Sequence, residues 1–336
     1  MVLSACRMLV QVPASARRRG AVVAGLSTLV ALAGCGATTT LNGAGASFPA
    51  PIYQRWFQEL ASKGVRVNYQ SVGSGAGVRQ FLSRTVDFAA SDVPMKADEI
   101  AKVSQGVVQI PMTAGAIAVA YNHKGCELKL TQAQLADVFL GRITNFSQLG
   151  CADKPIRVVH RSDGSGTTAN FTAHLSAVSP AWKAGPGNAK TVKWPTGIGA
   201  KGNEGVAAQL NQVEGAIGYV EAAFVKAPLQ AAALTNAAGE LVKPTLASEQ
   251  EALASIDLGP DLTGSSPNPP KGYPIVTFSW LLLYRSGNGA NHEALNRMLS
   301  FSLSDQAQAM APDLGFISLP PDVLAKARAA AATIKP

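Results

Sequence analysis

The sequence predicts an α/β protein of two lobes that are joined by two crossing strands. From residue 40 to residue 92, strand-like runs alternate with helix-like runs, and each helix follows a glycine-rich loop. Further along, two long apolar β-runs at 107–121 and 274–284 are suited to cross out of a first lobe and back to it. Two crossings predict a clamshell that is hinged and closes on its ligand.

The first lobe begins with a short strand at Thr40 and Leu41, a glycine-rich loop at 42–51, and a helix with apolar residues at helical spacing. A second strand, a second glycine-rich loop and a second helix follow, at 65–70, 71–77 and from 78 onward. A third short strand, 86–92, ends in Asp92. Ligands of such sheets lie at the carboxyl ends of the strands, so Asp92 is a candidate ligand-binding residue. The alternative is a turn or helix cap before Val93 and Pro94.

The first crossing consists of two apolar runs, 107–111 and 116–121, around a break at Thr113–Gly115. The second lobe then holds a helix at 130–140, a strand at 156–159, an irregular glycine-dense stretch at 197–203, a helix from 206 and a strand at 216–220. Residues 226–270 are predicted to be loops apart from a helix near 247–256, and helices near 290–303 and 321–332 should pack on the first lobe. These elements place lobe 1 at 35–112 and 277–336 and lobe 2 at 113–276.

Residues 160–171, HRSDGSGTTANF, carry the densest chemistry of the chain. Glycines let the backbone approach a ligand, and N–H groups at the first turn of a helix attract an anion. Arg161 adds a planar cation that suits a tetrahedral oxyanion, and Asp163 can hold it in place. The alternative is an Asp-Gly turn followed by a Ser/Thr cap, with Arg161 in solvent. The loops at 42–51 and 71–77 have the same character, which favours three helix N-termini that converge on one ion.

The N-terminus has the pattern of a secretory signal peptide. A basic segment, Arg17–Arg19, precedes an apolar run from Ala21 to Ala33, which is too short for a membrane span of about 20 residues. The run ends in Leu32-Ala33-Gly34-Cys35, which is typical of a lipobox. We therefore expect residues 1–34 to be removed and Cys35 to be lipidated. Ordinary cleavage beside an incidental cysteine is the alternative.

Charge and length limit the class of protein. Residues 1–34 hold four basic residues and no acidic ones, so their removal lowers the formal net charge from +8 to +4. This modest excess and the lack of a basic aromatic stripe argue against nucleic-acid binding. The remaining chain is long enough for two domains.

Two cysteines remain after the signal peptide and lipobox are set aside. Cys126 and Cys151 are 25 positions apart in a chain expected to be exported, so we predict a disulfide worth about 3 kcal/mol. Two buried free thiols are the alternative. The four histidines lack metal-ligand spacing, so we predict no metal site.

Six motifs together resemble the phosphate-binding subunit of the bacterial phosphate-specific ABC importer. The resemblance begins near Thr40, runs in the family's order, and rests on NGAGASFPAP, NYQSVGSGAGV, VDFAASD, HRSDGSGTTANF, KWPTGIGAKGNEGV and GAIGYVE. It implies a clamshell of the periplasmic-binding-protein type (type II) and a monomeric receptor that captures inorganic phosphate. It further implies delivery to the permease and ATPase subunits of a transporter, periplasmic location, contact with the membrane only through the lipid anchor, and no cofactor.

The resemblance also implies the phosphate ligands. In lobe 1 these are the Ser47 hydroxyl, the Phe48 backbone N–H, the Ser74 hydroxyl and Asp92. In lobe 2 they are Arg161, Ser165, the Gly166 backbone N–H and Thr167, with Asp163 orienting Arg161. The family often has threonine at the position of Ser47, and Ala76 interrupts the second glycine run. Neither difference removes a ligand.

Two other functions remain open from the sequence. One is a phosphatase-like or serine hydrolase, although neither Ser74 nor Ser165 fits Gly-x-Ser-x-Gly with a partner base. The other is a receptor for another oxyanion such as sulfate. Asp92 discriminates here, because a fully ionised dianion has no proton to donate to a carboxylate. We therefore assign no catalytic residue.

Overall fold

The computed structural model describes residues 39–336. The predicted signal peptide and the predicted lipidation site at Cys35 lie outside the described residues. Within residues 39–336, no helix combines the length and the apolar character that a membrane crossing needs.

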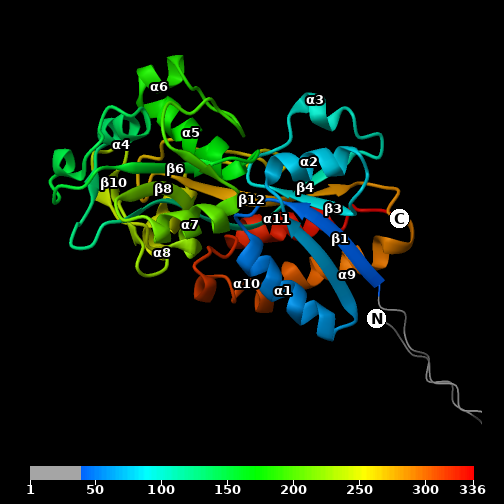
Figure 1. Cartoon of the computed structure of the whole chain (residues 1–336). Coiled ribbons are helices and arrows are strands. Elements are labelled where there is room, and N and C mark those ends of the chain that lie inside the picture. Colours follow the sequence, from blue (N-terminus) through cyan, green and yellow to red (C-terminus); the bar gives the residue numbers. More distant parts are fainter. Residues whose placement is uncertain (1–38) are drawn as a thin grey trace, which may run out of the picture. The chain divides into compact units, whose positions relative to one another are not determined.

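One large sheet organises the described chain (Figure 1). Its strands run in the order β2-β1-β3-β12-β4-β8-β6-β7, and β9 pairs with β4 on the edge opposite β8. Their bounds are β1 (Thr39–Gly45), β2 (Val65–Ser71), β3 (Phe88–Ser91), β4 (Val107–Asn122), β6 (Arg157–Arg161), β7 (Ile198–Ala200), β8 (Ala216–Glu221), β9 (Gln230–Ala231) and β12 (Val276–Tyr284). A small second sheet holds β5 (Lys129–Leu130), β10 (Ala233–Thr235) and β11 (Leu241–Val242).

Strand β4 connects the two halves of the large sheet. Its first part, up to Ala116, pairs with β12, and its last part, from Ile117, pairs with β8. We call the half with β1, β2 and β3 and its covering helices lobe 1, and the half with β6, β7 and β8 and its helices lobe 2. The predicted domain boundaries at 112/113 and 276/277 lie close to this change of partner, and they remain a prediction.

The predicted break in the first crossing at Thr113–Gly115 is wrong. β4 continues through these residues as a single strand. The irregularity is a bulge instead: Ser279 pairs with Thr113 and Trp280 with Pro111, so Met112 is the extra residue. Proline has no N–H and is tolerated next to a bulge, and at Pro111 β4 pairs with β12 alone, because its pairing with β8 begins only at Ile117.

Helices cover both faces of the sheet (Figure 1). In lobe 1, α2 and α3 lie on one face and α1, α9 and α11 on the other. In lobe 2, α4, α5 and α6 lie on the first side and α7 and α8 on the second. Their bounds are α1 (Ala50–Ser62), α2 (Ser74–Leu82), α3 (Ala97–Ile100), α4 (Gln132–Phe139), α5 (Gly166–Val178), α6 (Pro180–Ala184), α7 (Gly202–Gln212), α8 (Leu246–Leu253), α9 (His292–Ser302), α10 (Asp305–Gln308) and α11 (Pro321–Ala331).

The C-terminal helices return to lobe 1, as predicted. α9 packs against α1, and the indole Nε1 of Trp56 in α1 donates to the carbonyl oxygen of Ala307 in α10 at 2.9 Å. Trp56 is fully buried, so this hydrogen bond satisfies a polar atom that would otherwise be costly inside the core.

Two glycine-rich stretches are more regular than expected. Residues Asn42–Gly45 are the end of β1, so the first loop begins only at Ala46. The stretch 197–203, predicted to be irregular, forms β7 and the start of α7. Gly45 shows why a strand can hold glycines: a Cβ there would lie 2.1 Å from the carbonyl oxygen of Ala90 in β3. Glycine at this position allows close packing of β1 on β3 rather than a turn.

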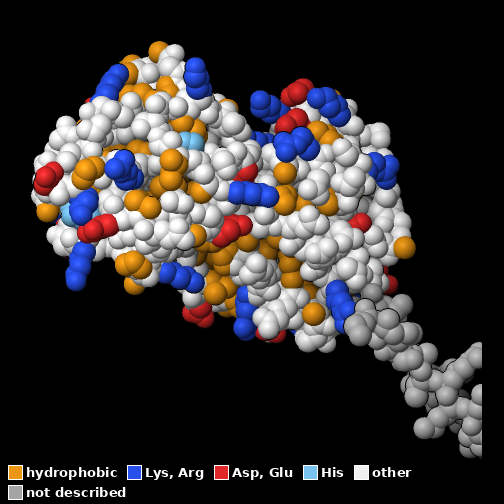
Figure 2. Space-filling view, in the orientation of Figure 1, with side chains coloured by type: hydrophobic (Ala, Val, Ile, Leu, Met, Phe, Trp, Pro, Cys, Tyr) orange, Lys and Arg blue, Asp and Glu red, His pale blue; other side chains and the backbone are white. Residues whose placement is uncertain are grey.

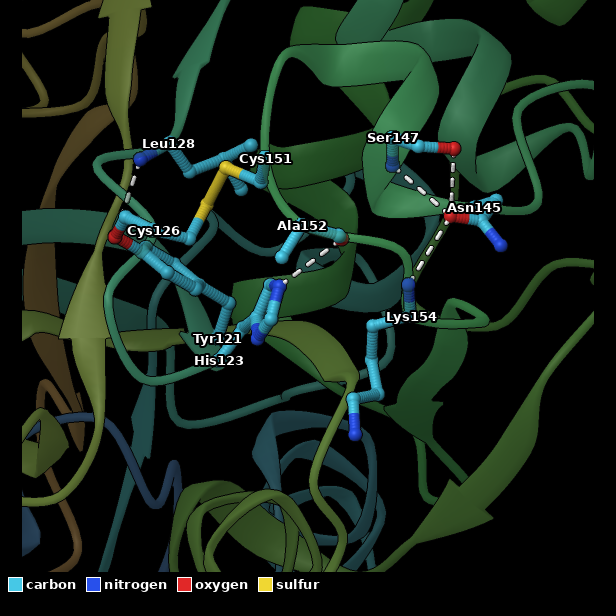
Figure 3. The surroundings of a disulfide bond; sticks show 9 residues. All are labelled: Tyr121, His123, Cys126, Leu128, Asn145, Ser147, Cys151, Ala152 and Lys154. Carbon is cyan, nitrogen blue, oxygen red and sulfur yellow. Dashed lines mark hydrogen bonds between the residues drawn. A yellow bond between two sulfur atoms is a disulfide. The ribbon is translucent and has the colours of Figure 1, made fainter.

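Cys126 and Cys151 form a disulfide with their Cα atoms 5.3 Å apart (Figure 3). The loop that it closes is also held by Tyr121 of β4, whose hydroxyl donates to the Cys126 carbonyl at 2.7 Å and accepts from the Leu128 N–H at 3.1 Å. Beside it, a ring nitrogen of His123 lies 3.2 Å from the Ala152 carbonyl oxygen. This histidine and these cysteines are therefore structural parts of lobe 2.

Candidate functional site

The predicted residues lie together at the carboxyl ends of parallel strands of the sheet. β1 and β3 are parallel, as are β6 and β8. Ser47 and Phe48 follow β1, Asp92 follows β3, and Arg161 ends β6. These positions are the carboxyl ends of their strands, where open α/β sheets bind ligands.

The first loop offers hydrogen-bond donors. Ser47 is about 1 % exposed and Phe48 is fully buried, yet the backbone N–H groups of both make no hydrogen bond with another described residue. The neighbouring Ala46 N–H, by contrast, donates to the Ala90 carbonyl at 2.9 Å. Buried N–H groups almost always have a partner, so this turn at the start of α1 is suited to an oxygen-rich ligand.

Ser74, the first residue of α2, is fully buried and lies at the junction of the two lobes. Its Oγ accepts from the Gly166 N–H of lobe 2 at 3.1 Å and from the Asp92 N–H at 3.3 Å. Its hydroxyl points to Asp92 Oδ2 at the long distance of 3.5 Å. Ser74 thus joins the ends of β3 and α2 to the start of α5.

Asp92 is the buried carboxylate of the site, at about 1 % exposure. Its Oδ1 accepts from the Ser279 hydroxyl of β12 at 2.9 Å. Burial raises the pKa of Asp92 to about 7, although Ser279, Arg161 and Ser74 partly oppose this rise. The group is therefore able to act as an acceptor or as a donor, depending on pH.

Arg161 and Asp163 form the ion pair of lobe 2. Arg161 donates through Nε to Asp163 Oδ1 at 2.7 Å and through Nη2 to Oδ2 at 2.5 Å. Burial alone would raise the pKa of Asp163, but the hydrogen bonds and charge of Arg161 lower it below its ordinary value. Because the pair leaves an N–H on each terminal nitrogen free, the guanidinium is fixed in place and can still bind an anion.

The N-terminus of α5 lies next to this guanidinium. Ser165 caps the helix by accepting from the Thr168 N–H at 3.0 Å. Thr167 Oγ1 accepts from Arg161 Nη1 at 3.3 Å. The sequence folds this way because Gly164 and Ser165 separate β6 from α5 and place the first turn of the helix at the site, where Ser165 Oγ and Ser74 Oγ accept from the N–H groups of Thr168 and Gly166.

The two lobes touch directly around these residues. Gly75 N–H donates to the Gly164 carbonyl at 2.8 Å, and the Asn170 side chain donates to the Asp92 carbonyl at 2.7 Å. Gly166 is the tightest point: a Cβ there would lie 2.6 Å from Ser74 Oγ and 2.7 Å from Asp92 Cβ. The conformation is therefore a closed one.

A pocket of about 470 Å³ opens beside Asp92. Figure 2 shows the surface hollowed between the region over α5 and α6 and the region over α2 and α3. The pocket is lined by residues of both regions, among them Glu99, Asn170 and Lys190, and burial lowers the pKa of Lys190. This pocket gives solvent a path to the edge of the site.

Several proteins are similar to this chain in sequence. The description of the matching family model is "PBP superfamily domain", and it matches residues 33–306. The phosphate-binding protein PstS of Pasteurella multocida is 39 % identical over 312 residues, which cover 86 % of this chain and 89 % of that protein. That of Haemophilus influenzae is 39 % identical over 307 residues, with 85 % and 90 % covered. The chain belongs to the PstS family.

Solved structures show the same fold. A periplasmic phosphate-binding protein, PfluDING, whose structure holds phosphate, matches with a TM-score of 0.72 at 23 % identity over 87 % of this chain and 93 % of that one. A phosphate ABC transporter substrate-binding protein from Clostridium perfringens matches with a TM-score of 0.65 at 20 % identity over 84 % and 100 %. The expected clamshell of the periplasmic-binding-protein type is confirmed.

The residues singled out in the sequence come together around one point in the PstS fold. One cluster links Ser74, Asp92 and Gly166, and another links Arg161, Asp163 and Thr167. Ser165 belongs to the site as the N-cap of α5, and Phe48 belongs to it through its free backbone N–H. Their roles as phosphate ligands remain a prediction.

Three polar residues of the site were not predicted. Ser279 hydrogen-bonds Asp92, Asn170 bridges the lobes, and Asn203 is fully buried against Ser47 and Thr167. Ser279 lies inside an apolar strand, and no pattern in the sequence points to it. Asn203 belongs to the KGNEGV motif, which is the signal in the sequence that points to it.

Among the described residues, the serine side chains of the site have no histidine beside them. Among the described residues, neither Ser74 nor Ser165 hydrogen-bonds a histidine. His160 and His174 contact the carbonyl oxygens of Arg161 and Pro267. Burial lowers the pKa of His174 to about 4, so it is neutral at physiological pH. Within residues 39–336, no group of His, Cys, Asp and Glu is arranged to hold a metal ion.

Proposed function

We propose that this protein is an extracytoplasmic receptor that binds inorganic phosphate with high affinity and delivers it to an ABC transporter. The observation that carries the proposal is the pairing of a fixed cation with one buried carboxylate in a site otherwise made of donors. Arg161, held by Asp163, offers a fixed positive charge to a tetrahedral anion, and the free N–H of Phe48 and the hydroxyls around it can donate to the anion. The Gly166 N–H donates to Ser74 Oγ in this structure and would have to exchange that acceptor for the anion.

The ligand set is the one that the sequence predicts, divided between two lobes. Lobe 1 supplies Ser47, Phe48, Ser74 and Asp92, and lobe 2 supplies Arg161, Ser165, Gly166 and Thr167. An ion that contacts both lobes stabilises the closed conformation through contacts that an open one lacks. Closure in turn would present one surface to the permease subunits, which is how a receptor reports that it is loaded.

Asp92 gives this site its preference for phosphate. Two like charges about 4 Å apart repel by roughly 4 kcal/mol at an effective dielectric near 20, so a bare carboxylate opposes an anion. Phosphate at neutral pH keeps at least one hydroxyl, which can donate to an ionised Asp92. Sulfate has none, so Asp92 would gain no donor beyond Ser279 and would face negative oxygens. The rejection of sulfate is strongest well above the pKa of Asp92, which is about 7, because there the carboxylate is fully ionised and cannot donate.

Location and anchoring follow from the N-terminal sequence. A signal peptide and lipobox ending at Cys35 would place the mature chain in the periplasm on a lipid anchor, next to the permease and ATPase subunits of its transporter. Receptor function without catalysis fits the lack of a histidine at Ser74 and Ser165 within the described residues.

Calorimetry of the phosphate-stripped mature protein tests this function. We expect phosphate to bind at one site per chain and sulfate to bind far more weakly. Binding of both ions with similar affinity would replace the proposal with a general oxyanion receptor. Turnover of a phosphomonoester that disappears in Ser165→Ala would replace it with an enzyme.

A further inference from the structure

Asn203 occupies the point where both lobes and the anion ligands meet. It is the second residue of α7 and is fully buried. Its backbone N–H and its Nδ2 each donate to Ser47 Oγ of lobe 1 at 3.0 Å, and Nδ2 also donates to Thr167 Oγ1 at 3.2 Å. It therefore contacts one predicted phosphate ligand from each lobe.

The orientation of its amide is fixed by the backbone. Asn203 Oδ1 accepts from the N–H of Glu221, at the end of β8, at 2.9 Å. A backbone N–H can only donate, so the amide oxygen must face it and the NH₂ group must face Ser47 and Thr167. Both protons of the NH₂ group are then used, one for each hydroxyl.

The hydroxyl protons are fixed as a result. Ser47 Oγ accepts from both donors of Asn203, and Thr167 Oγ1 accepts from Asn203 Nδ2 and Arg161 Nη1. Two accepted hydrogen bonds occupy both lone pairs of a hydroxyl, which leaves it only its proton to offer. Neither hydroxyl donates to another described residue.

We propose that Asn203 is the positioning residue that commits the hydroxyls of Ser47 and Thr167 to donate to the bound anion. The inference rests on the proposed phosphate-binding function and deepens it. With both hydroxyls fixed as donors, Asp92 is left as the acceptor of the site. Asn203 thereby favours an anion that accepts at all but one of its contacts, and it holds α7 of lobe 2 against the first loop of lobe 1.

Two substitutions separate this role from a structural one. Asn203→Asp keeps the shape of the side chain and the acceptor for the Glu221 N–H. Its second carboxylate oxygen, however, would accept hydrogen bonds from the hydroxyls of Ser47 and Thr167, which could then no longer donate to the anion. Asn203→Ala loses the acceptor and both Nδ2 donors, yet leaves the hydroxyls free to turn toward the anion. We expect phosphate affinity to fall about tenfold in Asn203→Ala and roughly 100-fold or more in Asn203→Asp, because two donors to a charged ligand are lost. A structural role would give the reverse order.

A double-mutant cycle distinguishes redirected hydroxyls from simple charge repulsion. In the background Ser47→Ala with Thr167→Val there is no hydroxyl to redirect, so Asn203→Asp should cost at least tenfold less affinity there than in the wild type. Asn211→Asp, at the exposed far end of α7, controls for the added charge. Equal losses in both backgrounds, or wild-type affinity in Asn203→Asp, would overturn the inference while the receptor function stands. Absence of phosphate binding by the wild type would remove both.

Discussion

The two lobes contribute different chemistry to the same site. In lobe 2, the anion-binding groups hold one another: Arg161 is fixed by Asp163, and Asp163 Oδ1 also accepts from the Gly202 N–H at 3.0 Å. The Tyr219 hydroxyl accepts from the Arg161 N–H at 3.1 Å and lies 2.7 Å from Thr168 Oγ1. Lobe 1 has no comparable cation within the site. It offers two free N–H groups, two serines and the carboxylate of Asp92.

This difference indicates that the two lobes contribute differently to affinity and to selectivity. Lobe 2 is an anion-binding surface that is ordered by its own contacts, so it needs no ligand to form. Lobe 1 closes over that surface with a group that an anion repels unless the anion carries a proton. Affinity then depends mainly on lobe 2 and on closure, whereas selectivity depends on lobe 1. Each statement predicts a different response to substitution.

The largest effect is expected where the lobes meet, in Gly166→Ala. The added Cβ would lie 2.6 Å from Ser74 Oγ and 2.7 Å from Asp92 Cβ, so lobe 1 could not close on α5. Alanine is compatible with the first turn of a helix, so lobe 2 itself should remain folded. We expect phosphate affinity to fall about 1,000-fold, since several hydrogen bonds to a charged ligand depend on closure.

Calorimetry with phosphate measures this loss, and small-angle scattering measures closure. Phosphate should reduce the radius of gyration of the wild type and leave that of Gly166→Ala unchanged. Gly205→Ala is the matched control, because a Cβ at that helical glycine meets nothing closer than 3.8 Å. Wild-type affinity in Gly166→Ala would mean that the closed contacts are dispensable.

A smaller change is expected in lobe 1 from Asp92→Asn, and it concerns selectivity rather than affinity. The amide can donate to an oxygen of sulfate, where the ionised carboxylate can only accept. At about pH 9, where Asp92 with its pKa of about 7 is almost wholly ionised, we expect the ratio of phosphate to sulfate affinity to fall roughly 100-fold, chiefly because sulfate binds better. Calorimetry with both ions gives the ratio. Asp98→Asn, which removes an exposed charge of α3, is the control. An unchanged ratio in Asp92→Asn would exclude Asp92 from discrimination.

The contrast between the lobes also explains what the sequence could predict. The groups of lobe 2 lie close together in the chain, from Arg161 to Thr167, so a single loop-and-helix pattern revealed them. Helices and strands with strong periodicity, such as α1, α4 and α11, were likewise predictable. Short or weakly patterned elements such as α3, α10 and β10 were not.

Residues that act across long sequence separations could not be found from local patterns. Ser279 reaches Asp92 over 187 positions and Asn203 reaches Ser47 over 156, and such contacts depend on how the lobes close. The role of two glycines could not be predicted for a similar reason. Gly45 and Gly77 look like loop glycines, yet a Cβ on Gly77 would lie 2.5 Å from Gly45 Cα, so the two serve close packing between α2 and β1.

The smallest expected effect is a pH dependence of sulfate binding, and it isolates the proton on Asp92. Burial raises the pKa of Asp92 to about 7, so the protonated form, which can donate to sulfate, becomes the main form as pH falls below that value. Sulfate itself stays fully ionised throughout this range, so any change belongs to the protein. If sulfate requires protonated Asp92, its affinity should rise roughly tenfold between about pH 8 and about pH 6, because binding takes up close to one proton above the pKa and almost none well below it. Titrations of wild type and Asp92→Asn with sulfate across this range measure the slope. Asp92→Asn should show none of it, since its amide does not titrate, and a slope of equal size in both proteins would assign the proton to another group.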